Sequence, residues 1–322
     1  MFKITLQDGK IFDCESNESI IAGAIRNGVF LDHSCLTGRC SSCKFRIISG
    51  QTVCDTEEIP LTESEKSEGY ILSCIRRPIS DIAIEAEDLS EYGLIKPKTV
   101  PAKINKITPL TEDIILVKLR FPPNQKPFFL EGQYLNVIKG SLKRSYSIAN
   151  SNNAEDLELI IKNYQGGLMS KYWFEEAKIN DLLRLEIPKG TFFLRQHSGK
   201  SALVFLATGT GIAPIKSILE NPKNQELIKQ YQQVIVLWGM KYSKELFWSP
   251  SQELVKFAPV LSRESLPKKY VQNCLEELSI DWNHSVVYAC GSDDMIQESK
   301  RKSIQLGLKP NHFYSDAFVA SN

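Results

Sequence analysis

The sequence lacks any long apolar run and any excess of charge of one sign. No window approaches the roughly 18 uninterrupted apolar residues of a membrane-spanning helix, and Met1 to Thr5 lack the basic and apolar regions of a signal peptide. Lys and Arg total 39 against 38 Asp and Glu, so the chain has no basic field for non-specific binding to nucleic acid. We expect a soluble, cytoplasmic protein without membrane or nucleic-acid partners.

Cysteine is present but not at the density of a small secreted protein stapled by disulfides. The chain has 8 cysteines in 322 residues, a length that allows two or three domains. We therefore expect reduced thiols. Four of them fall in one spaced constellation, whereas Cys14, Cys54, Cys274 and Cys290 are scattered.

Residues 1–92 are expected to form a small first domain. The pattern predicts a strand pair around Ile4 to Phe12, a helix from about Ser19 to Asn27 closed by Gly28, and alternating strands at 44–48 and 81–85. This combination predicts a small mixed sheet around a cysteine-rich loop. Prolines and a glycine between Ser90 and Pro101 interrupt any periodic pattern and predict a linker.

Two further domains are expected, at 98–196 and 200–322. The first has short β-type runs, broken by Gly, Pro and Asn, at 114–119, 134–138, 157–161 and 182–187, which predict an antiparallel barrel. In the second, near-continuous apolar strands at 203–207, 234–238 and 286–289 alternate with polar helical stretches, which predicts a parallel α/β domain. The expected fold class is thus α+β and α/β, in several domains.

The cysteine constellation reads Cys35-Leu-Thr-Gly-Arg-Cys40-Ser-Ser-Cys43, with Cys74 well downstream. This is the C-x4-C-x2-C…C spacing of plant-type [2Fe–2S] centres, in which a short loop delivers three of four thiolates and its amides donate to the sulfurs. A four-cysteine zinc site is the alternative, but zinc ribbons favour two C-x2-C pairs, and Cys74 has no partner at that spacing. Unligated core cysteines are the other alternative.

A second motif, Arg144-Ser145-Tyr146-Ser147, falls on a strand of the predicted barrel. A guanidinium suits a phosphate and an aromatic ring suits a flat cofactor face, although the same residues also occur as plain surface and packing residues. Gly166-Gly167-Leu168-Met169-Ser170 then precedes a predicted helix at 171–177, whose free amides would suit a pyrophosphate; alone, it could be a glycine turn with a serine near the cap. The two motifs in this order indicate flavin binding.

A third motif, Gly209-Thr210-Gly211-Ile212-Ala213-Pro214, joins a buried strand to a helix, where backbone amides can approach a dinucleotide pyrophosphate. It lacks the G-x-G-x-x-G form. Cys290-Gly291 ends another buried strand at the same sheet edge; Cys290 could also be an ordinary buried thiol. Lys241 and Lys244 could meet a 2′-phosphate or simply be solvated, so we expect NADH while leaving NADPH open.

Residues 1 to about 90 resemble plant-type ferredoxin domains of the β-grasp type, apart from Ser41, where many members have glycine. The later motifs resemble those of the ferredoxin-NADP reductase family. By that resemblance Arg144 would neutralise the FAD phosphate, Tyr146 would lie against the isoalloxazine and Ser147 would hydrogen-bond near its reactive nitrogen.

The same resemblance puts Cys290 and Gly291 beside the nicotinamide and Phe318 near the flavin, and it implies Tyr146, Ser147 and Cys290 as catalytic residues. The stretches Arg144 to Asn150, Val236 to Met240 and Tyr288 to Ser292, with the tail Phe313 to Val319, are similar to the reductases of CDP-3,6-dideoxyhexose biosynthesis.

That likeness implies electron flow from NADH to FAD, to the [2Fe–2S] cluster and on to an acceptor, an iron–sulfur, pyridoxamine-phosphate-dependent sugar dehydratase. Two alternatives remain: a reductase component of a phenol- or methane-hydroxylase type oxygenase, and a non-enzymatic metal-binding module. The acidic run from Asp55 to Glu68 could dock an acceptor, but a solvated loop is the simpler interpretation.

Overall fold

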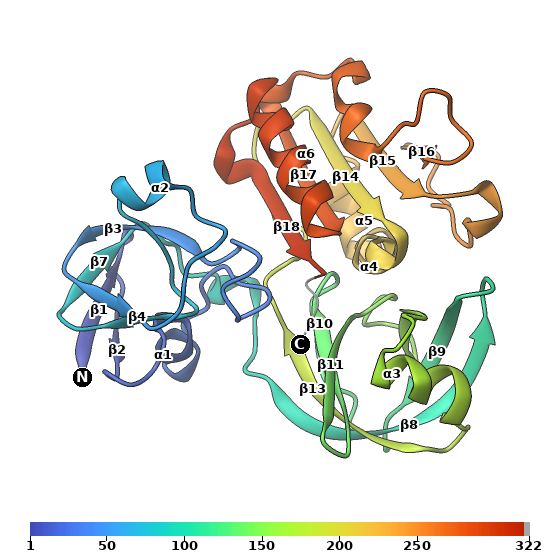
Figure 1. The fold of residues 1–322 in the computed structure, drawn as a ribbon, viewed down its shortest axis with the longest axis horizontal. Helices are drawn as coiled ribbons and strands as arrows, with labels where there is room; N and C mark the ends of the chain where they lie inside the picture. The colour runs from blue at the N-terminus through green and yellow to red at the C-terminus, as the bar shows by residue number, and fades with distance from the viewer. Residues whose placement is uncertain (319–322) are drawn as a thin grey trace. The chain divides into compact units, whose positions relative to one another are not determined.

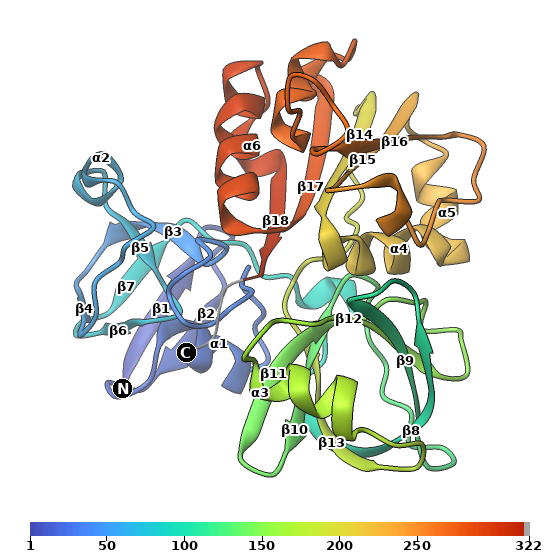
Figure 2. The ribbon, with the colours of Figure 1, turned by 45° about the vertical axis from the view of Figure 1, so that its right-hand side comes forward.

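The computed structural model describes residues 1–318 and divides into two compact units. The first unit comprises Met1–Pro97 together with Gly190–Phe192. The second comprises Lys98–Lys189 and the chain from Phe193 onward. Each unit has its own sheets, whose strands are labelled in Figures 1 and 2.

The first unit contains short strands and two short helices. They are β1 (Phe2–Leu6), β2 (Ile11–Cys14), α1 (Ile20–Arg26), β3 (Lys44–Ser49), β4 (Thr52–Cys54), α2 (Glu63–Ser67), β5 (Tyr70–Leu72), β6 (Arg76–Pro78), β7 (Ile82–Ile84) and the 3-10 turn η1 (Ser90–Tyr92). Five strands form a mixed sheet in the order β2-β1-β7-β3-β5, in which only β1 and β7 run parallel. β4 and β6 form a separate antiparallel pair.

Helix α1 begins and ends where the sequence predicts. The Ser19 hydroxyl accepts from the Ala22 amide at 3.2 Å, and Gly28 follows the helix with φ of 77°. Ile20 and Ile21 are buried against the sheet strands that carry Ile4 and Ile84. These residues belong to the core of the first unit, and the cysteine-rich loop lies a few residues after α1 in the chain.

The second unit opens with an antiparallel sheet of six strands. Its elements are β8 (Lys98–Pro109), β9 (Ile114–Arg120), β10 (Tyr134–Lys139), β11 (Leu142–Ser147), β12 (Leu157–Lys162), α3 (Leu168–Lys171), the π-helical turn η2 (Tyr172–Glu176) and β13 (Leu182–Lys189). The order is β11-β10-β13-β8-β9-β12, and an isolated bridge from Ile148 to Leu159 links the two edges. β8 begins at Lys98, inside the predicted linker.

A parallel sheet with helices follows in the same unit. Its elements are β14 (Ala202–Thr208), the turn η3 (Gly209–Gly211), α4 (Ile212–Glu220), α5 (Pro222–Ile228), β15 (Gln233–Met240), η4 (Ser243–Glu245), β16 (Val255–Leu261), η5 (Val271–Asn273), η6 (Leu275–Glu277), η7 (Trp282–His284), β17 (Ser285–Gly291), α6 (Asp293–Gln305), η8 (Pro310–His312) and β18 (Phe313–Ala317). All strand pairs are parallel, in the order β16-β15-β14-β17-β18. Figure 2 shows α6 beside β17 and β18.

The parallel strands are buried as their apolar sequences predict. Every residue of β17 is buried, and β14 is buried up to its last residue. The predicted strands at 203–207, 234–238 and 286–289 are confirmed as parts of β14, β15 and β17. Since the strands are parallel, their carboxyl ends meet at one edge of the sheet, where open α/β sheets bind ligands.

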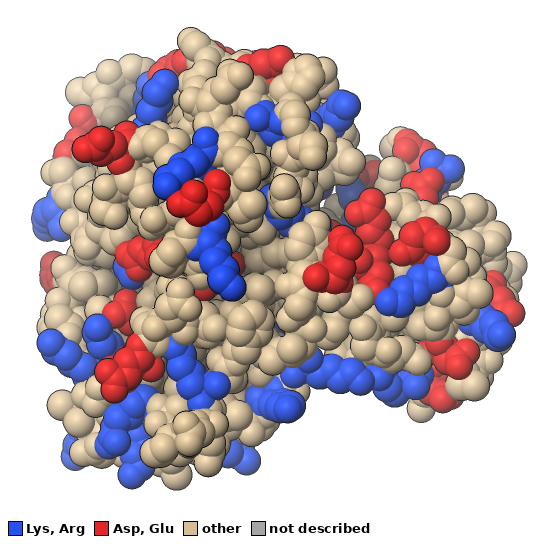
Figure 3. Space-filling view, turned by 180° about the vertical axis from the view of Figure 1, so that it is seen from behind, with Lys and Arg blue, Asp and Glu red and all other residues tan. Residues whose placement is uncertain are grey.

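Basic and acidic side chains occur together on the surface of the protein. Figure 3 shows basic and acidic side chains interspersed over the face that it presents, as the near-equal totals of 39 and 38 lead one to expect. Within residues 1–318, no helix combines the length and the apolar character that crossing a bilayer requires.

Candidate functional site

The four constellation cysteines lie in two pairs in the first unit. The Sγ atoms of Cys43 and Cys74 are 3.0 Å apart, and the Cys35 amide donates to the Cys40 sulfur at 3.4 Å. Within residues 1–318, no three His, Cys, Asp or Glu side chains are grouped as they would be around a single metal ion. Two pairs of thiols suit two irons, each with two thiolates, better than one tetrahedral zinc.

The loop around the thiols favours the thiolate of Cys35 and Cys74, whereas the pKa values of Cys40 and Cys43 are raised by the hydrogen bonds that they donate to these two sulfurs and by burial. The Thr37 amide donates to the Cys35 sulfur at 3.4 Å. The pKa of Cys35 is lowered to about 5, chiefly by the hydrogen bond from the Cys40 thiol and also by the amides of Thr37 and Arg39, against the effect of burial. The pKa of Cys74 is lowered in the same way, first by the Cys43 thiol.

Backbone conformation explains the small residues of this loop. Gly38 has φ of 72°, and a Cβ there would lie 2.6 Å from Cδ1 of Ile75, next to Cys74. Ser41 also lies in the left-handed region, with φ of 59°. A residue with a Cβ is strained there, so the serine that departs from the ferredoxin pattern occupies a conformation that favours glycine.

One residue of the acidic run is not solvated, and sequence reasoning missed it. Glu58 is 5% exposed, and its carboxylate accepts from the Leu72 amide at 2.7 Å and from the Arg76 Nη2 at 2.6 Å. Leu72 and Arg76 lie two residues before and two residues after Cys74. Glu58 therefore holds both sides of the segment that carries this cysteine, and the interpretation of the whole run as a solvated loop is wrong at this position.

Strand β11 carries the residues of the second motif. Because side chains alternate along a strand, Arg144 and Tyr146 share one face and Ser147 lies on the other. Arg144 is partly exposed, and its Nη1 donates to the Lys143 carbonyl at 2.8 Å. Ser147 is 7% exposed. The strand thus presents a guanidinium and an aromatic ring side by side, a pair suited to a flat cofactor with a phosphate.

The phenol of Tyr146 is held by a residue that the sequence did not single out. Trp173 Nε1 donates to the Tyr146 hydroxyl at 2.9 Å, and the two rings meet edge to face with centroids 6.0 Å apart. The pKa of Tyr146 is raised to about 12, chiefly because burial disfavours the phenolate. Tyr146 therefore remains neutral over the working pH range.

The glycine pair of this domain begins a helix slightly earlier than predicted. Gly167 caps α3, which passes into the π-helical turn η2, so the predicted helix at 171–177 was wrong in its start and its type. A Cβ on Gly167 would lie 3.1 Å from both the Ser170 hydroxyl and the Tyr164 carbonyl. The Ser170 hydroxyl accepts from the Tyr164 amide at 2.9 Å, which fixes the turn while no side chain caps α3.

The third motif lies where β14 and β17 end side by side. A Cβ on Gly211 would lie 2.3 Å from the Cys290 carbonyl oxygen, and one on Gly291 would lie 2.1 Å from the Thr208 hydroxyl. Both glycines are therefore required by close approach of the two loops. The Trp238 indole donates to the Gly209 carbonyl at 2.8 Å. Gly211 precedes α4 with no side-chain cap, which leaves the helix amides directed to the sheet edge.

Cys290 lies at this edge beside Asp316 and Phe318. Cys290 is fully buried, and burial raises the pKa of its thiol, with a further contribution from Asp316. Asp316, which the sequence reasoning missed, is 4% exposed and lies opposite Cys290 in the register of β17 and β18. The Phe318 amide donates to the Gly291 carbonyl at 2.8 Å, and the Phe318 residue is 36% exposed. Val319, the last residue of the predicted tail motif, lies outside the described residues.

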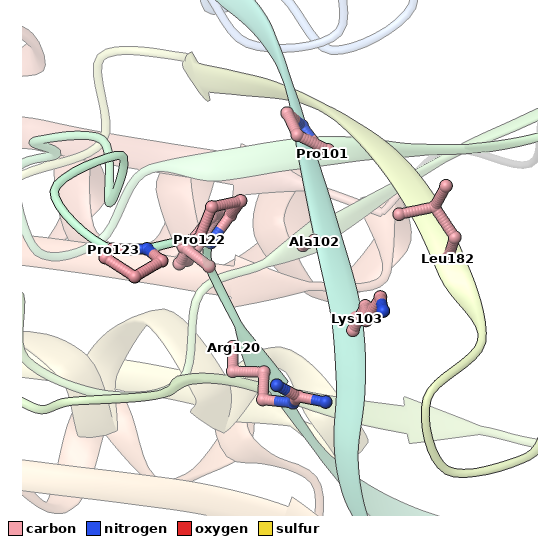
Figure 4. Close-up of a pocket in the computed structure, with 8 residues that line it drawn as sticks. Pro101, Ala102, Lys103, Arg120, Pro122, Pro123 and Leu182 are labelled. Carbon is pink, nitrogen blue, oxygen red and sulfur yellow. The ribbon is translucent and has the colours of Figure 1, made fainter.

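One hollow on the second unit lies away from these motifs. Figure 4 shows its lining residues, which come from β8, the end of β9, the segment after it and β13. They are Pro101, Ala102, Lys103, Arg120, Phe121, Pro122, Pro123 and Leu182. None of them is a predicted site residue.

Three family models match consecutive segments of the chain. A 2Fe-2S iron-sulfur cluster binding domain matches residues 4–78, an oxidoreductase FAD-binding domain matches 101–194, and an oxidoreductase NAD-binding domain matches 205–301. The predicted cofactors, a [2Fe–2S] cluster, FAD and a nicotinamide dinucleotide, are confirmed. The alternative of a non-enzymatic metal-binding module is wrong, because two oxidoreductase domains follow the cluster domain.

Curated relatives extend over nearly the whole chain. Protein RfbI of Salmonella typhimurium is 36% identical, covering 97% of this chain and 94% of its own length. The CDP-6-deoxy-L-threo-D-glycero-4-hexulose-3-dehydrase reductase of Yersinia pestis is also 36% identical, covering 97% of both chains.

Among solved structures, the Amycolatopsis cytochrome P450 reductase GcoB matches with a TM-score of 0.76 over 99% of both chains, at 22% identity. This likeness supports a ferredoxin-reductase-type fold with an added cluster domain.

Proposed function

This chain belongs to the same family of iron–sulfur flavoprotein reductases as the CDP-6-deoxy-L-threo-D-glycero-4-hexulose-3-dehydrase reductases, and we propose that it serves the same step. In this proposal it takes electrons from NADH and delivers them to an iron–sulfur, pyridoxamine-phosphate-dependent dehydratase in CDP-3,6-dideoxyhexose biosynthesis. The observation that carries the proposal is 36% identity over 97% of both chains.

For the first unit we propose a β-grasp ferredoxin domain at residues 1–92, with Cys35, Cys40, Cys43 and Cys74 as the cluster ligands. The pairing of the four thiols and the amide donors at Cys35 support this set. When bound, the cluster supplies one-electron transfer. The contribution of the chain is to hold four thiolates close together and to surround them with N–H donors.

For the second unit we propose a flavin barrel at 98–196. Arg144 would bind the FAD phosphate, Tyr146 would lie against the flavin ring and Ser147 would hydrogen-bond near its reactive nitrogen. Gly166, Gly167 and Ser170 would present the amides of α3 to the pyrophosphate. The neutral, Trp173-bound phenol of Tyr146 supports an orienting role for this residue, because it has no tendency to ionise.

We propose a nicotinamide domain at 200–322. Gly209, Thr210, Gly211 and Pro214 would receive the dinucleotide, with Cys290 and Gly291 beside the nicotinamide and Phe318 near the flavin. The close approach of Gly211 to Cys290 supports one shared site at this edge. Since Cys290 is fully buried with a raised thiol pKa, we assign it a packing and orienting role at the nicotinamide and no role as a base.

A preference for NADH is supported by the loop after β15. The Glu245 carboxylate accepts from the Lys241 amide at 3.0 Å, and the Glu264 carboxylate accepts from the Ser243 amide at 2.8 Å. In doubly wound sheets an acidic residue after the second strand suits the ribose hydroxyls of NAD, whereas a 2′-phosphate needs cations. The carboxylates of Glu245 in this loop and of Glu264, which follows β16 and binds the loop at Ser243, would repel that phosphate. The cytoplasmic location expected from the sequence stays a prediction.

A turnover assay with a defined acceptor tests the proposal. The purified reductase, NADH, the dehydratase and its CDP-sugar substrate are combined without oxygen, and the deoxygenated sugar product is measured. A matched reaction replaces the dehydratase with a hydroxylase component. Product that depends on both the reductase and the dehydratase supports the proposal. Turnover of the hydroxylase alone would contradict it.

A further inference from the structure

Helix α4 begins at one cofactor motif of the second unit and contacts the segment that follows the other. Its first turn follows Gly209–Gly211, the loop proposed for the dinucleotide. Its residues Lys216 and Ser217 and its C-cap Asn221 contact residues 149–151, which lie just beyond the Arg144–Ser147 motif. A single helix of nine residues therefore joins the proposed nicotinamide loop to the continuation of the proposed flavin strand.

Two neighbouring side chains of this helix donate to backbone carbonyls of that segment. Lys216 Nζ donates to the Ala149 carbonyl at 2.9 Å, and the Ser217 hydroxyl donates to the Asn150 carbonyl at 2.7 Å. The Lys216 side chain is 13% exposed and Ser217 is fully buried. Since hydrogen bonds to backbone oxygens fix position and direction, these bonds define where the continuation of the flavin strand lies relative to α4.

Lys216 is held by two carboxylates as well. It lies 3.3 Å from Glu158 of β12 and 2.8 Å from Glu220, four residues further along α4. Glu158 is 14% exposed and also pairs with Lys118 at 2.8 Å. Its carbonyl accepts from the Ala149 amide at 2.8 Å, and its amide donates to the Asn150 side-chain oxygen at 2.9 Å, so it binds the same segment that Lys216 contacts. A lysine is rarely buried unless paired, and an apolar residue would fill this helix face at a lower desolvation penalty. What the ion pair adds is a fixed position of α4 relative to β12.

We propose that Lys216, with Glu158 as its counter-ion, is a positioning residue for hydride transfer. In that step the C4–H bond of NADH breaks, the hydride carries two electrons to FAD, and NAD⁺ leaves. The rate of such a step depends steeply on the separation of donor and acceptor, and a displacement of about 1 Å can lower it by about 100-fold. Lys216 sets this separation by fixing the helix that begins at the nicotinamide loop to the strand that carries the flavin motif.

The test is anaerobic stopped-flow reduction of the bound flavin by NADH and by NADH deuterated at C4. For Lys216→Met we expect a limiting rate lower by about 10- to 100-fold, a larger isotope effect, and an NADH Kd and FAD content close to those of the parent. Lys216→Arg should recover most of the rate. Lys229→Met is the matched control, because Lys229 is 60% exposed and pairs only with Glu226 among the described ion pairs.

A parent-like limiting rate in Lys216→Met would overturn the proposal. A rate that falls only in proportion to lost FAD would also overturn it, because the residue would then serve stability alone. Should Lys216→Met fail to fold, Ser217→Ala removes one directed bond from the same segment and must lower the limiting rate and raise the isotope effect. The assay contains no acceptor protein, so its outcome is independent of whether a dehydratase receives the electrons.

Discussion

Removing either partner of the buried Glu58–Arg76 pair should make the iron–sulfur cluster easier to lose in urea. The two substitutions should differ in how much stability they cost. Arg76→Met leaves the Glu58 carboxylate, whose side chain is 4% exposed, without its cation. An uncompensated buried charge costs about 3–5 kcal/mol. Glu58→Gln instead leaves Arg76, which is 24% exposed and also donates to the Thr52 hydroxyl at 3.1 Å.

The cost of Glu58→Gln is smaller for two reasons. Glutamine retains an oxygen for the Leu72 amide, which Glu58 binds at 2.7 Å, and the stranded guanidinium can reach water. The free energy of unfolding then falls by the contribution of the charge-assisted hydrogen bonds, which is about 2 kcal/mol after allowance for the partial exposure of Arg76. That energy corresponds to about a 30-fold change in an equilibrium constant.

The assay is the loss of the visible circular dichroism of the cluster during a urea titration. The expected order of midpoints is parent, then Glu58→Gln, then Arg76→Met, with the double variant above Arg76→Met because it carries no stranded charge. Glu57→Gln is the control, since Glu57 is the exposed neighbour in the same run. Equal midpoints for Glu57→Gln and Glu58→Gln, or a midpoint for Arg76→Met above that of Glu58→Gln, would contradict the stabilising role of the buried ion pair.

Three further predictions concern other parts of the chain. Ser41→Gly should stabilise the cluster loop by about 1 kcal/mol, because φ of 59° is unfavourable for serine, and Ser41→Ala should give no gain in a thermal melt of the cluster absorbance. Gly211→Ala should raise the NADH Kd at least about tenfold with FAD retained, since its Cβ would lie 2.3 Å from the Cys290 carbonyl. A parent-like Kd in a flavin-reduction titration would contradict the proposed role of this loop in binding the dinucleotide.

The third concerns pH: the pKa of His197 is lowered from 6.5 to about 4, chiefly because burial disfavours the charged ring. The unfolded chain therefore takes up this proton first as pH falls, so stability should decline between pH 6.5 and about 4. His197→Gln should flatten that decline in urea titrations, and an unchanged slope would show that other groups cause it.

The sequence predicted those elements that are determined by residues close together in the chain. Ser19 and Gly28 predicted the limits of α1, the cysteine spacing predicted the ligand loop, and near-continuous apolar runs predicted the buried parallel strands. The glycine motif before α4 could be placed because its strand and helix were both evident.

The residues that the sequence did not reveal act through contacts distant along the chain. Glu58 reads as one carboxylate in an acidic run, and only its bonds to the segment around Cys74 distinguish it. Lys216 reads as an ordinary helix lysine until β12 brings Glu158 to it. Asp316 is similar, because its neighbour Cys290 comes from another strand. Periodicity and spacing carry no information about such pairs.

Within this chain, electrons pass from NADH through FAD to the cluster. The direct measurement is electron paramagnetic resonance of the purified holoprotein, frozen at intervals after mixing with NADH without oxygen. We predict that flavin absorbance is bleached first and that the signal of a reduced [2Fe–2S] centre follows, with both changes lost in Gly211→Ala at low NADH. Flavin bleaching without any cluster signal would contradict the relay, as would a protein that contains zinc in place of iron.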